Sequence, residues 1–427
     1  MQSMSIKKFE QIKAVNYWEK APQHVGFIRE SYLTAVVSYI GSQLLKVLIG
    51  QRRSGKSTIL KQVISALLKQ GTPKQNILYL NFELNEVRFI QSADGLLEVI
   101  DHFFKALKPK GKVYLFLDEI QEVEGWESVV NGYLANERHD IEFFLTGSNA
   151  HLLSTELSTF VTGRYVEIPV YPFSFAEYVA LKGGELNKAQ LIVYLEDSGI
   201  PELLSLKEKQ QKVSYLNALK DSVLMNDIVK RFNIKNTKLL ISLLDFIIDN
   251  IGRLFSLNSI TKKLNASGMN VSAITVGNYL DYLERTYLIH DIRRYDVKGK
   301  KILEGERKYY LNDLGFWNYL QSSFDGGVTR RLGNYVYLAL LQSGYTVYVG
   351  NIYNLEVDFV AEKNQQTIYL QVTYLLHGED VVEREYGSLE KIKDNWPKWV
   401  VSLDDMSFPP KNGILHIPAW DLFKHLN

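Results

Sequence analysis

The chain has no cysteine, no excess of one charge sign and no long apolar run. The absence of cysteine excludes disulfide bonds, thiolate zinc sites and cysteine nucleophiles. Lys and Arg number 49 and Asp and Glu 48, so no global field favours nucleic acid or a membrane as partner. The most apolar segment, 239–255, contains Asp245, Asp249 and Arg253 and is too short and polar to span a membrane. Residues 1–8 lack the apolar core of a signal peptide, and we expect a cytoplasmic location.

The overall composition is that of a folded globular protein. Of the 427 residues, 46% are apolar and 23% are charged, which is typical of chains with sizeable cores. A chain of this length holds about two to four domains. Because the total charge is balanced, a nucleic-acid partner would have to be recognised by a local basic patch.

A strand–loop–helix pattern near the beginning of the chain organises the sequence. The apolar run 44–49 predicts a buried strand, and apolar residues at helical spacing follow from Lys56. The loop between them fits the phosphate-binding pattern G-x-x-x-x-G-K-[ST], in which Gly50 and Gly55 let backbone N–H groups turn toward phosphate oxygens. The alternative is an ordinary turn before a helix, but the context favours ATP binding. The expected ATP-binding residues are Gly50, Gln51, Arg52, Arg53, Ser54, Gly55, Lys56, Ser57 and Thr58.

Two adjacent acids complement this loop. The apolar run 113–117 ends in Asp118 and Glu119, and ligands of parallel sheets bind beyond the carboxyl ends of strands. We expect Lys56 to contact the β- and γ-phosphates, Ser57 and Asp118 to hold Mg²⁺, and Glu119 to orient the attacking water. Alone, an acidic pair after a strand is usually a solvated turn. The two motifs together predict ATP hydrolysis.

Polar residues after the next strand are candidates for sensing the γ-phosphate. The apolar run that begins at Ile141 ends in small polar residues, of which we favour Ser148, with Thr146 and Asn149 as alternatives. Arg164 precedes another predicted strand. It can act as a finger on the γ-phosphate of a neighbouring subunit, or as a cation that caps a helix end, and spacing alone does not separate these readings.

Arg29 and Tyr32 precede the first strand, where nucleotide-binding folds often border the adenine. Base contact is one reading of this pair. The other is a surface arginine and a packed tyrosine.

The second half of the chain changes from helical to mixed patterns. Residues 171–235 are helical and suggest a lid over the nucleotide. Residues 251–311 predict two short helices and a β-hairpin with a basic tip, the layout of a winged helix. From 251 to 310 there are eleven Lys or Arg against six Asp or Glu, which favours contact with DNA phosphates. The alternative is a winged helix that packs against protein.

Two later strands present polar side chains in the manner of a restriction-type nuclease. The first carries Glu356 and Asp358, and the second carries Gln371 and Thr373. In such nucleases the second strand normally carries Glu-x-Lys, whose carboxylate binds Mg²⁺ and whose lysine steadies the developing charge. A neutral amide is a poor substitute ligand, so we expect no nuclease activity.

Over residues 25–425 the chain resembles the prokaryotic AAA+-like ATPases that end in a nuclease-like domain. This resemblance implies an α/β multidomain protein with a P-loop sheet of order 5-1-4-3-2, a helical lid, a winged helix and a C-terminal restriction-endonuclease-like domain. It also implies that Arg164 is a finger and that Gly199 and Pro201 lie near the nucleotide. Gly333 replaces a helix glutamate of related sequences. The stretches that carry the resemblance are 50–58, 115–121, 145–148, 163–165, 199–201 and 356–359.

The sequence therefore predicts a Mg²⁺-dependent ATPase that acts as a switch or remodelling protein and couples ATP to DNA or protein binding. The alternative is a DNA-binding regulator in which ATP only sets conformation, and a Mg²⁺-dependent nuclease is a third hypothesis. Expected partners are ATP, double-stranded DNA, another protein and further copies of the chain. A membrane is not an expected partner.

The expected catalytic residues are Glu119, Lys56, Arg164 and Ser148. The expected parts are an extension (1–26), the ATPase core (27–170), the lid (171–235), the winged helix (236–325) and the nuclease-like domain (326–427).

Overall fold

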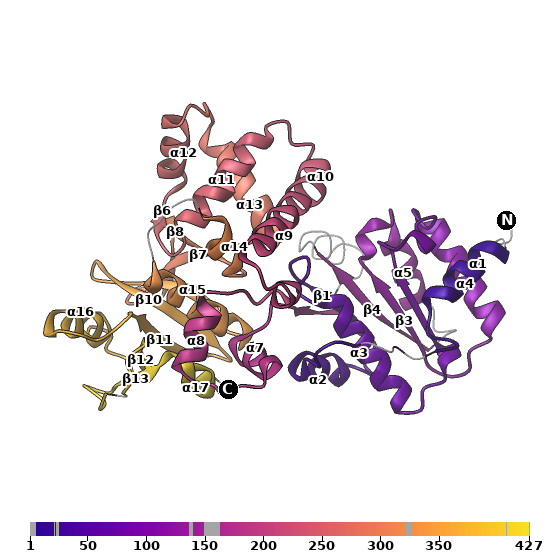
Figure 1. Cartoon of the computed structure of the whole chain (residues 1–427), viewed down its shortest axis with the longest axis horizontal. Helices are drawn as coiled ribbons and strands as arrows, with labels where there is room; N and C mark the ends of the chain where they lie inside the picture. The colour runs from indigo at the N-terminus through magenta and orange to yellow at the C-terminus, as the bar shows by residue number, and fades with distance from the viewer. Residues whose placement is uncertain are drawn as a thin grey trace. The chain divides into compact units, whose positions relative to one another are not determined.

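The computed structural model describes residues 6–20, 22, 25–135, 140–148, 163–321, 327–406 and 408–426. It divides the chain into two compact units, Met1–Val170 and Tyr171–Asn427, which are coloured indigo to magenta and magenta to yellow in Figure 1. None of the described helices has the length and apolarity needed to cross a membrane.

The first unit is built on a parallel sheet of five strands in the order β2-β3-β4-β1-β5. This order confirms the predicted 5-1-4-3-2, read from the other edge. The strands are nearly continuous apolar runs because parallel sheets are covered on both faces. Their bounds are β1 Leu45–Ile49, β2 Ile77–Asn81, β3 Val113–Asp118, β4 Ile141–Gly147 and β5 Tyr165–Pro169.

Helices cover both faces of this sheet (Figure 1). Successive strand residues point to opposite faces, so Phe144 joins the core under α3, whereas Phe143 lies 6.3 Å from Tyr133 of α5, measured between ring centroids. The helices are α1 Ile6–Val15, α2 Glu30–Ser38, α3 Lys56–Lys69, α4 Ala93–Leu107 and α5 Trp126–Leu134, with short 3₁₀ turns η1 Lys74–Asn76, η2 Asn85–Val87 and η3 Ile120–Glu122.

The segment after α1 covers the free edge of β2. The Asn16 amide donates to the carbonyl oxygen of Tyr79 and accepts from its N–H, at 2.9 and 2.8 Å. The Trp18 indole donates to the carbonyl oxygen of Ile77 at 2.6 Å. These side chains pair backbone groups that an edge strand otherwise leaves open to another chain.

The second unit contains an eight-stranded mixed sheet, as far as the chain is described. Its order is β13-β12-β11-β10-β9-β7-β8-β6. The strands are β6 Leu254–Phe255, β7 Ile289–Asp296, β8 Lys301–Leu311, β9 Thr346–Ile352, β10 Leu355–Lys363, β11 Gln366–Val372, β12 Lys398–Ser402 and β13 Ile414–Pro418.

Most helices of the second unit share one apolar core that runs in sequence from Phe175 to Leu426, whereas Tyr386 and Leu389 of α16 belong to a second apolar cluster. The helices assigned to a lid, α7 to α9, therefore pack with elements of the C-terminal part, and the lid role itself stays a prediction. The helices are α7 Phe175–Lys182, α8 Lys188–Leu195, α9 Lys209–Ser222, α10 Lys230–Phe232, α11 Thr237–Asp249, α12 Leu257–Ala266, α13 Ala273–Arg285, α14 Gly315–Leu320, α15 Val328–Gln342, α16 Glu379–Glu390 and α17 Leu422–Leu426, with shorter turns η4 Pro201–Ser205, η5 Val223–Val229 and η6 Ala419–Asp421.

The two short helices and the hairpin predicted between 251 and 311 are present as α12, α13 and the antiparallel pair β7–β8. Strand β7 also pairs in parallel with β9, so the hairpin continues into the C-terminal strands as a single sheet. The domain boundary placed between 325 and 326 thus falls within a stretch that one sheet and one core connect. The winged-helix and nuclease-like assignments stay predictions.

Candidate functional site

The phosphate-binding loop lies between the end of β1 at Ile49 and the start of α3 at Lys56. A Cβ atom at Gly50 would lie 2.2 Å from the carbonyl oxygen of Val170, so no other residue fits there. Gly55 adopts the left-handed conformation (φ 98°) just before the helix. The two glycines of the motif are therefore required by close approach and by backbone conformation.

Arg29 stabilises this loop through a hydrogen bond to its backbone. Its guanidinium donates to the carbonyl oxygen of Ser54 at 2.9 Å and lies 4.3 Å from the centre of the Tyr32 ring. Only 2% of Arg29 is exposed, so the alternative of a surface arginine is wrong. The base-contact hypothesis for Arg29 and Tyr32 stays a prediction.

Lys56 and Glu119 face each other across the site. The Lys56 ammonium lies 3.5 Å from Glu119 Oε1 and donates to the carbonyl oxygens of Gly50 and Gln51 at 3.0 Å. Burial works to raise the pKa of Glu119, but Lys56, Gln121 and Arg52 outweigh it and leave this pKa below its usual value. Glu119 is thus an enclosed but ionised carboxylate, the state required of a general base.

Asp118 is the centre of a hydrogen-bonded group at the end of β3. Its Oδ1 accepts from Ser57 Oγ at 3.0 Å and from Thr146 Oγ1 at 2.5 Å, and its Oδ2 accepts from Tyr79 OH at 2.7 Å and Asn81 Nδ2 at 3.0 Å. Burial and the nearby Glu119 charge raise the pKa of Asp118, and these donors oppose that rise. The carboxylate is held rigidly beside Ser57.

Two γ-phosphate sensor candidates lie at this site in different positions. Thr146 Oγ1 donates to Asp118 and accepts from the Glu119 N–H at 2.8 Å. Ser148 lies beside Gln121, whose amide donates to Ser148 Oγ at 3.3 Å and to Glu119 Oε2 at 2.5 Å. Asn149, the third candidate, lies outside the described residues.

Sequence reasoning did not select Gln121, Tyr79 or Asn81. Gln121 could have been found from its position two residues after Glu119. Asn81 could have been found because it is the last residue of β2, the strand next to β3.

The side chains fit ATP and Mg²⁺. Ser57 Oγ and Asp118 Oδ1 are oxygen donors 3.0 Å apart, and Mg²⁺ prefers oxygen ligands with water completing its shell. Ser54 Oγ is buried in the loop and has no hydrogen-bond partner among the described residues. A buried hydroxyl without a partner is costly unless a ligand satisfies it, and a phosphate oxygen at this loop would do so.

Arg164 lies at the other end of the sheet. Its carbonyl oxygen accepts from the N–H of Leu45 at 2.9 Å, which places it where β1 begins, whereas the P-loop follows the end of β1. The five residues of β1 separate these two ends by roughly 13 Å, at 3.3 Å per residue. Arg164 therefore does not border the P-loop of its own chain.

Gly199 and Pro201 belong to the second unit and have local roles there. The Gly199 N–H donates to Asp313 Oδ2 and its carbonyl oxygen accepts from the Phe173 N–H, both at 2.7 Å. A Cβ atom at Gly199 would lie 2.5 Å from the Phe173 carbonyl oxygen, and Pro201 begins η4. Their contact with a nucleotide stays a prediction.

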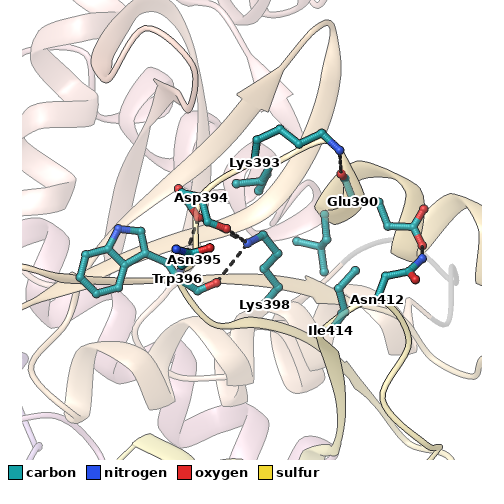
Figure 2. Close-up of a pocket in the computed structure, with 11 residues that line it drawn as sticks. Glu390, Lys393, Asp394, Asn395, Trp396, Lys398, Asn412 and Ile414 are labelled. Atoms are coloured by element: carbon teal, nitrogen blue, oxygen red, sulfur yellow. Dashed lines mark hydrogen bonds and ion pairs between the residues drawn. The ribbon is translucent and has the colours of Figure 1, made fainter.

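A surface cavity of about 590 Å³ also lies in the second unit (Figure 2). Asp394, Trp396, Lys398 and Asn412 are among its lining residues. The Lys398 ammonium donates to the carbonyl oxygens of Asp394 and Trp396 at 2.6 and 3.1 Å, so its charge stabilises the loop before β12. This cavity is not part of the phosphate site.

Comparisons with known proteins agree with the geometry of the first unit. Residues 42–179 match the family described as AAA domain, and residues 188–326 match a domain of unknown function. An uncharacterized protein of Haemophilus influenzae is 35% identical over 379 residues, covering 88% of this chain and 92% of that protein. An uncharacterized protein of Methanocaldococcus jannaschii is 32% identical, covering 82% of this chain and 79% of that protein.

Among solved structures, the Walker-type ATPase of Pyrococcus abyssi aligns with a TM-score of 0.49 at 16% identity, covering 70% of this chain and 97% of that chain. The chain belongs to the family of the Haemophilus and Methanocaldococcus relatives, and its residues 42–179 form a P-loop domain of the AAA type.

Proposed function

We propose that the protein binds and hydrolyses ATP with Mg²⁺ and uses this reaction as a switch or to remodel a partner. The observation that carries the proposal is a group of four side chains at the carboxyl end of the sheet. Lys56 and Ser57 at the start of α3 face Glu119 and Asp118 at the end of β3, at 3.5 and 3.0 Å.

The residues have distinct roles in this proposal. Backbone N–H groups of the loop and the Lys56 ammonium bind the phosphates, and Ser57 and Asp118 hold Mg²⁺, which neutralises phosphate charge when bound. Glu119 accepts a proton from the attacking water. Gln121 fixes the orientation of the Glu119 carboxylate through its 2.5 Å hydrogen bond.

The test compares wild type with Lys56→Ala and Glu119→Gln. We expect Lys56→Ala to lose nucleotide affinity, and Glu119→Gln to retain it while hydrolysis falls by about 10²–10⁴-fold, the usual contribution of a general base. Calorimetric titration gives the affinity and phosphate release gives the rate. The control is Glu124→Gln, an exposed acid of the same segment. A wild-type protein that neither binds nor hydrolyses ATP would end the proposal.

A second proposed function is contact with DNA through the β7–β8 hairpin. Several basic residues of the module are neutralised, because Arg285, Arg294 and Arg307 pair with Asp281, Glu306 and Asp291. The exposed cations of the hairpin are Arg293, Lys298, Lys300 and Lys301. This distribution supports contact with phosphates by the hairpin tip.

The exposed face of α13 carries little positive charge. Its exposed side chains are Ile274, Asn278 and Asp281, and 77% of Ile274 is exposed. We therefore expect binding to be insensitive to DNA sequence, because phosphate contacts carry no base information.

The test is a duplex titration at several salt concentrations with wild type and a Lys298→Gln/Lys300→Gln/Lys301→Gln variant. Removing three phosphate contacts reduces the slope of log affinity against log salt by about 2.7. The control is Lys391→Gln, an exposed lysine of the C-terminal part. Absence of duplex binding at low salt would favour a protein-packing role. If ATP changes duplex affinity while wild type hydrolyses no ATP, nucleotide only sets conformation.

A further inference from the structure

A charge cluster in the second unit joins the buried Lys308 to two partly exposed carboxylates and includes none of the residues assigned to ATP. Glu356 and Asp358 are two residues apart on β10, and both carboxylates lie within 3.4 Å of one ammonium, that of Lys308. Two neighbouring carboxylates are a donor set of the kind that binds divalent cations.

Lys308 of β8 supplies a positive charge to this pair. Its ammonium lies 2.5 Å from Glu356 Oε1 and 3.4 Å from Asp358 Oδ1, although β7 and β9 separate β8 from β10 in the sheet order. Only 4% of Lys308 is exposed. Burial works to lower its pKa, but Tyr310, Asp358 and Glu356 raise the pKa of Lys308 above its usual value. The side chain is an enclosed cation at neutral pH.

The remaining polar groups of the cluster bond to one another. Asp358 Oδ2 accepts from the Val372 N–H at 2.9 Å, and Gln371 Oε1 accepts from the Asp358 N–H at 2.6 Å. The Gln371 amide donates to Glu385 Oε2 at 3.2 Å. Among the described residues, no group of three or more His, Asp and Glu is arranged to hold a metal ion. A divalent ion that binds between the two carboxylates would have to displace the Lys308 ammonium.

We propose that Lys308 is a built-in cation that takes the place of a metal ion between Glu356 and Asp358. The acidic pair is neutralised within the chain, which joins the hairpin to the C-terminal strands without metal. It follows that the C-terminal strands carry no metal-dependent cleavage of phosphodiesters at this pair.

The experiment is Mn²⁺ titration of the full chain, followed by electron paramagnetic resonance. All arms carry Ser57→Ala/Asp118→Asn, so that the ATP site contributes no Mn²⁺ binding. We compare three chains: the background itself, which keeps Lys308, the background with Lys308→Met, and the background with Lys308→Met/Asp358→Asn. The control is Lys363→Met, which removes a lysine of β10 outside the cluster.

We expect Lys308→Met to bind one Mn²⁺ at least tenfold more tightly than the background, and Asp358→Asn to abolish this gain. A folded Lys308→Met chain without a gain would overturn the proposal. The proposal would also be overturned if the chain that keeps Lys308 bound Mn²⁺ and Asp358→Asn removed this binding.

If Lys308→Met does not fold, Lys308→Gln replaces it, because the amide removes the charge and keeps hydrogen-bond donors for Glu356 and Asp358. If neither variant folds, the proposal is tested by two chains that both keep Lys308: the background itself and the background with Asp358→Asn. Asp358-dependent Mn²⁺ binding there contradicts the proposal, and its absence supports it.

Discussion

Asp313 is a carboxyl group enclosed in the second unit by three donors. Ser198 Oγ donates at 2.5 Å, and the N–H groups of Gly199 and Gly315 donate at 2.7 Å. Burial raises the pKa of Asp313 to about 6 from the ordinary 3.8, even though these donors lower it. Asp313 therefore holds its proton more tightly in the folded than in the unfolded chain.

This shift predicts a pH dependence of stability. Its stabilising contribution is complete below pH 3.8 and is lost as pH rises through 6. Relative to Asp313→Asn, the free energy of unfolding of wild type should fall by about 2 kcal/mol between pH 4 and 7, at 1.36 kcal/mol per pKa unit, because part of the contribution is already lost at pH 4. Urea unfolding at four pH values measures the difference. Asp380→Asn, an exposed acid, is the control, and a pH-independent difference between wild type and Asp313→Asn would contradict this expectation.

Single residues were predictable where a short motif fixes them. Lys56, Ser57, Asp118 and Glu119 come together because each lies at the end of a strand or the start of a helix that the local pattern identifies. Arg29 was harder to interpret, because its buried bond to Ser54 depends on a turn that the sequence does not specify.

At the scale of elements, an ion network joins three strands at the beginning of the sheet. Glu142 of β4 is 3% exposed and accepts from Lys46 of β1 at 2.6 Å and from Lys112, just before β3, at 2.8 Å. The Gly41 N–H donates to the same carboxylate at 2.7 Å. Lys46 is fully buried, so its charge depends on this partner.

Replacing Glu142 with Gln should therefore lower the free energy of unfolding by about 3–5 kcal/mol, because it leaves a buried ammonium without its counter-charge. The double variant Lys46→Met/Glu142→Leu should recover most of this loss, since apolar pairs replace buried ion pairs well. Denaturant unfolding monitored by circular dichroism measures both. Glu98→Gln, exposed on α4, is the control. Equal stability of Glu142→Gln and wild type would show that the network is not needed.

The order of the first sheet was predictable, because strands alternate with helices and their phosphate motifs belong at defined strand ends. The second sheet was not. Its hairpin joins β9 through residues 294–296 and 349–351, which are distant in sequence and carry no motif. Patterning predicts local strands and hairpins, but pairing between distant strands depends on the packed core.

At the scale of the whole molecule, the finger role of Arg164 stays a prediction that involves a second copy of the chain. Because Arg164 lies at the end of the sheet away from its own P-loop, a finger role requires a neighbour. Arg164→Ala should then reduce hydrolysis by at least about 10²-fold, given that arginine fingers contribute 10³–10⁵.

Mixing variants tests this directly. Arg164→Ala keeps its Glu119, and Glu119→Gln keeps its Arg164, so an equimolar mixture should hydrolyse ATP faster than the sum of the two alone. Arg88→Ala, an exposed arginine of the first unit, is the control. A mixture that only equals the sum, or an Arg164→Ala chain with the wild-type rate, would show that Arg164 is not a finger.

The continuous second sheet also sets the distance along the sheet between the hairpin and the last strand. Six inter-strand steps separate β8 from β13, about 29 Å at 4.8 Å per step. The hairpin and the last strand cannot change this spacing unless backbone hydrogen bonds between β7 and β9 break. A ligand at the hairpin and another at the β13 edge would thus be connected through one hydrogen-bonded sheet, without a linker between them.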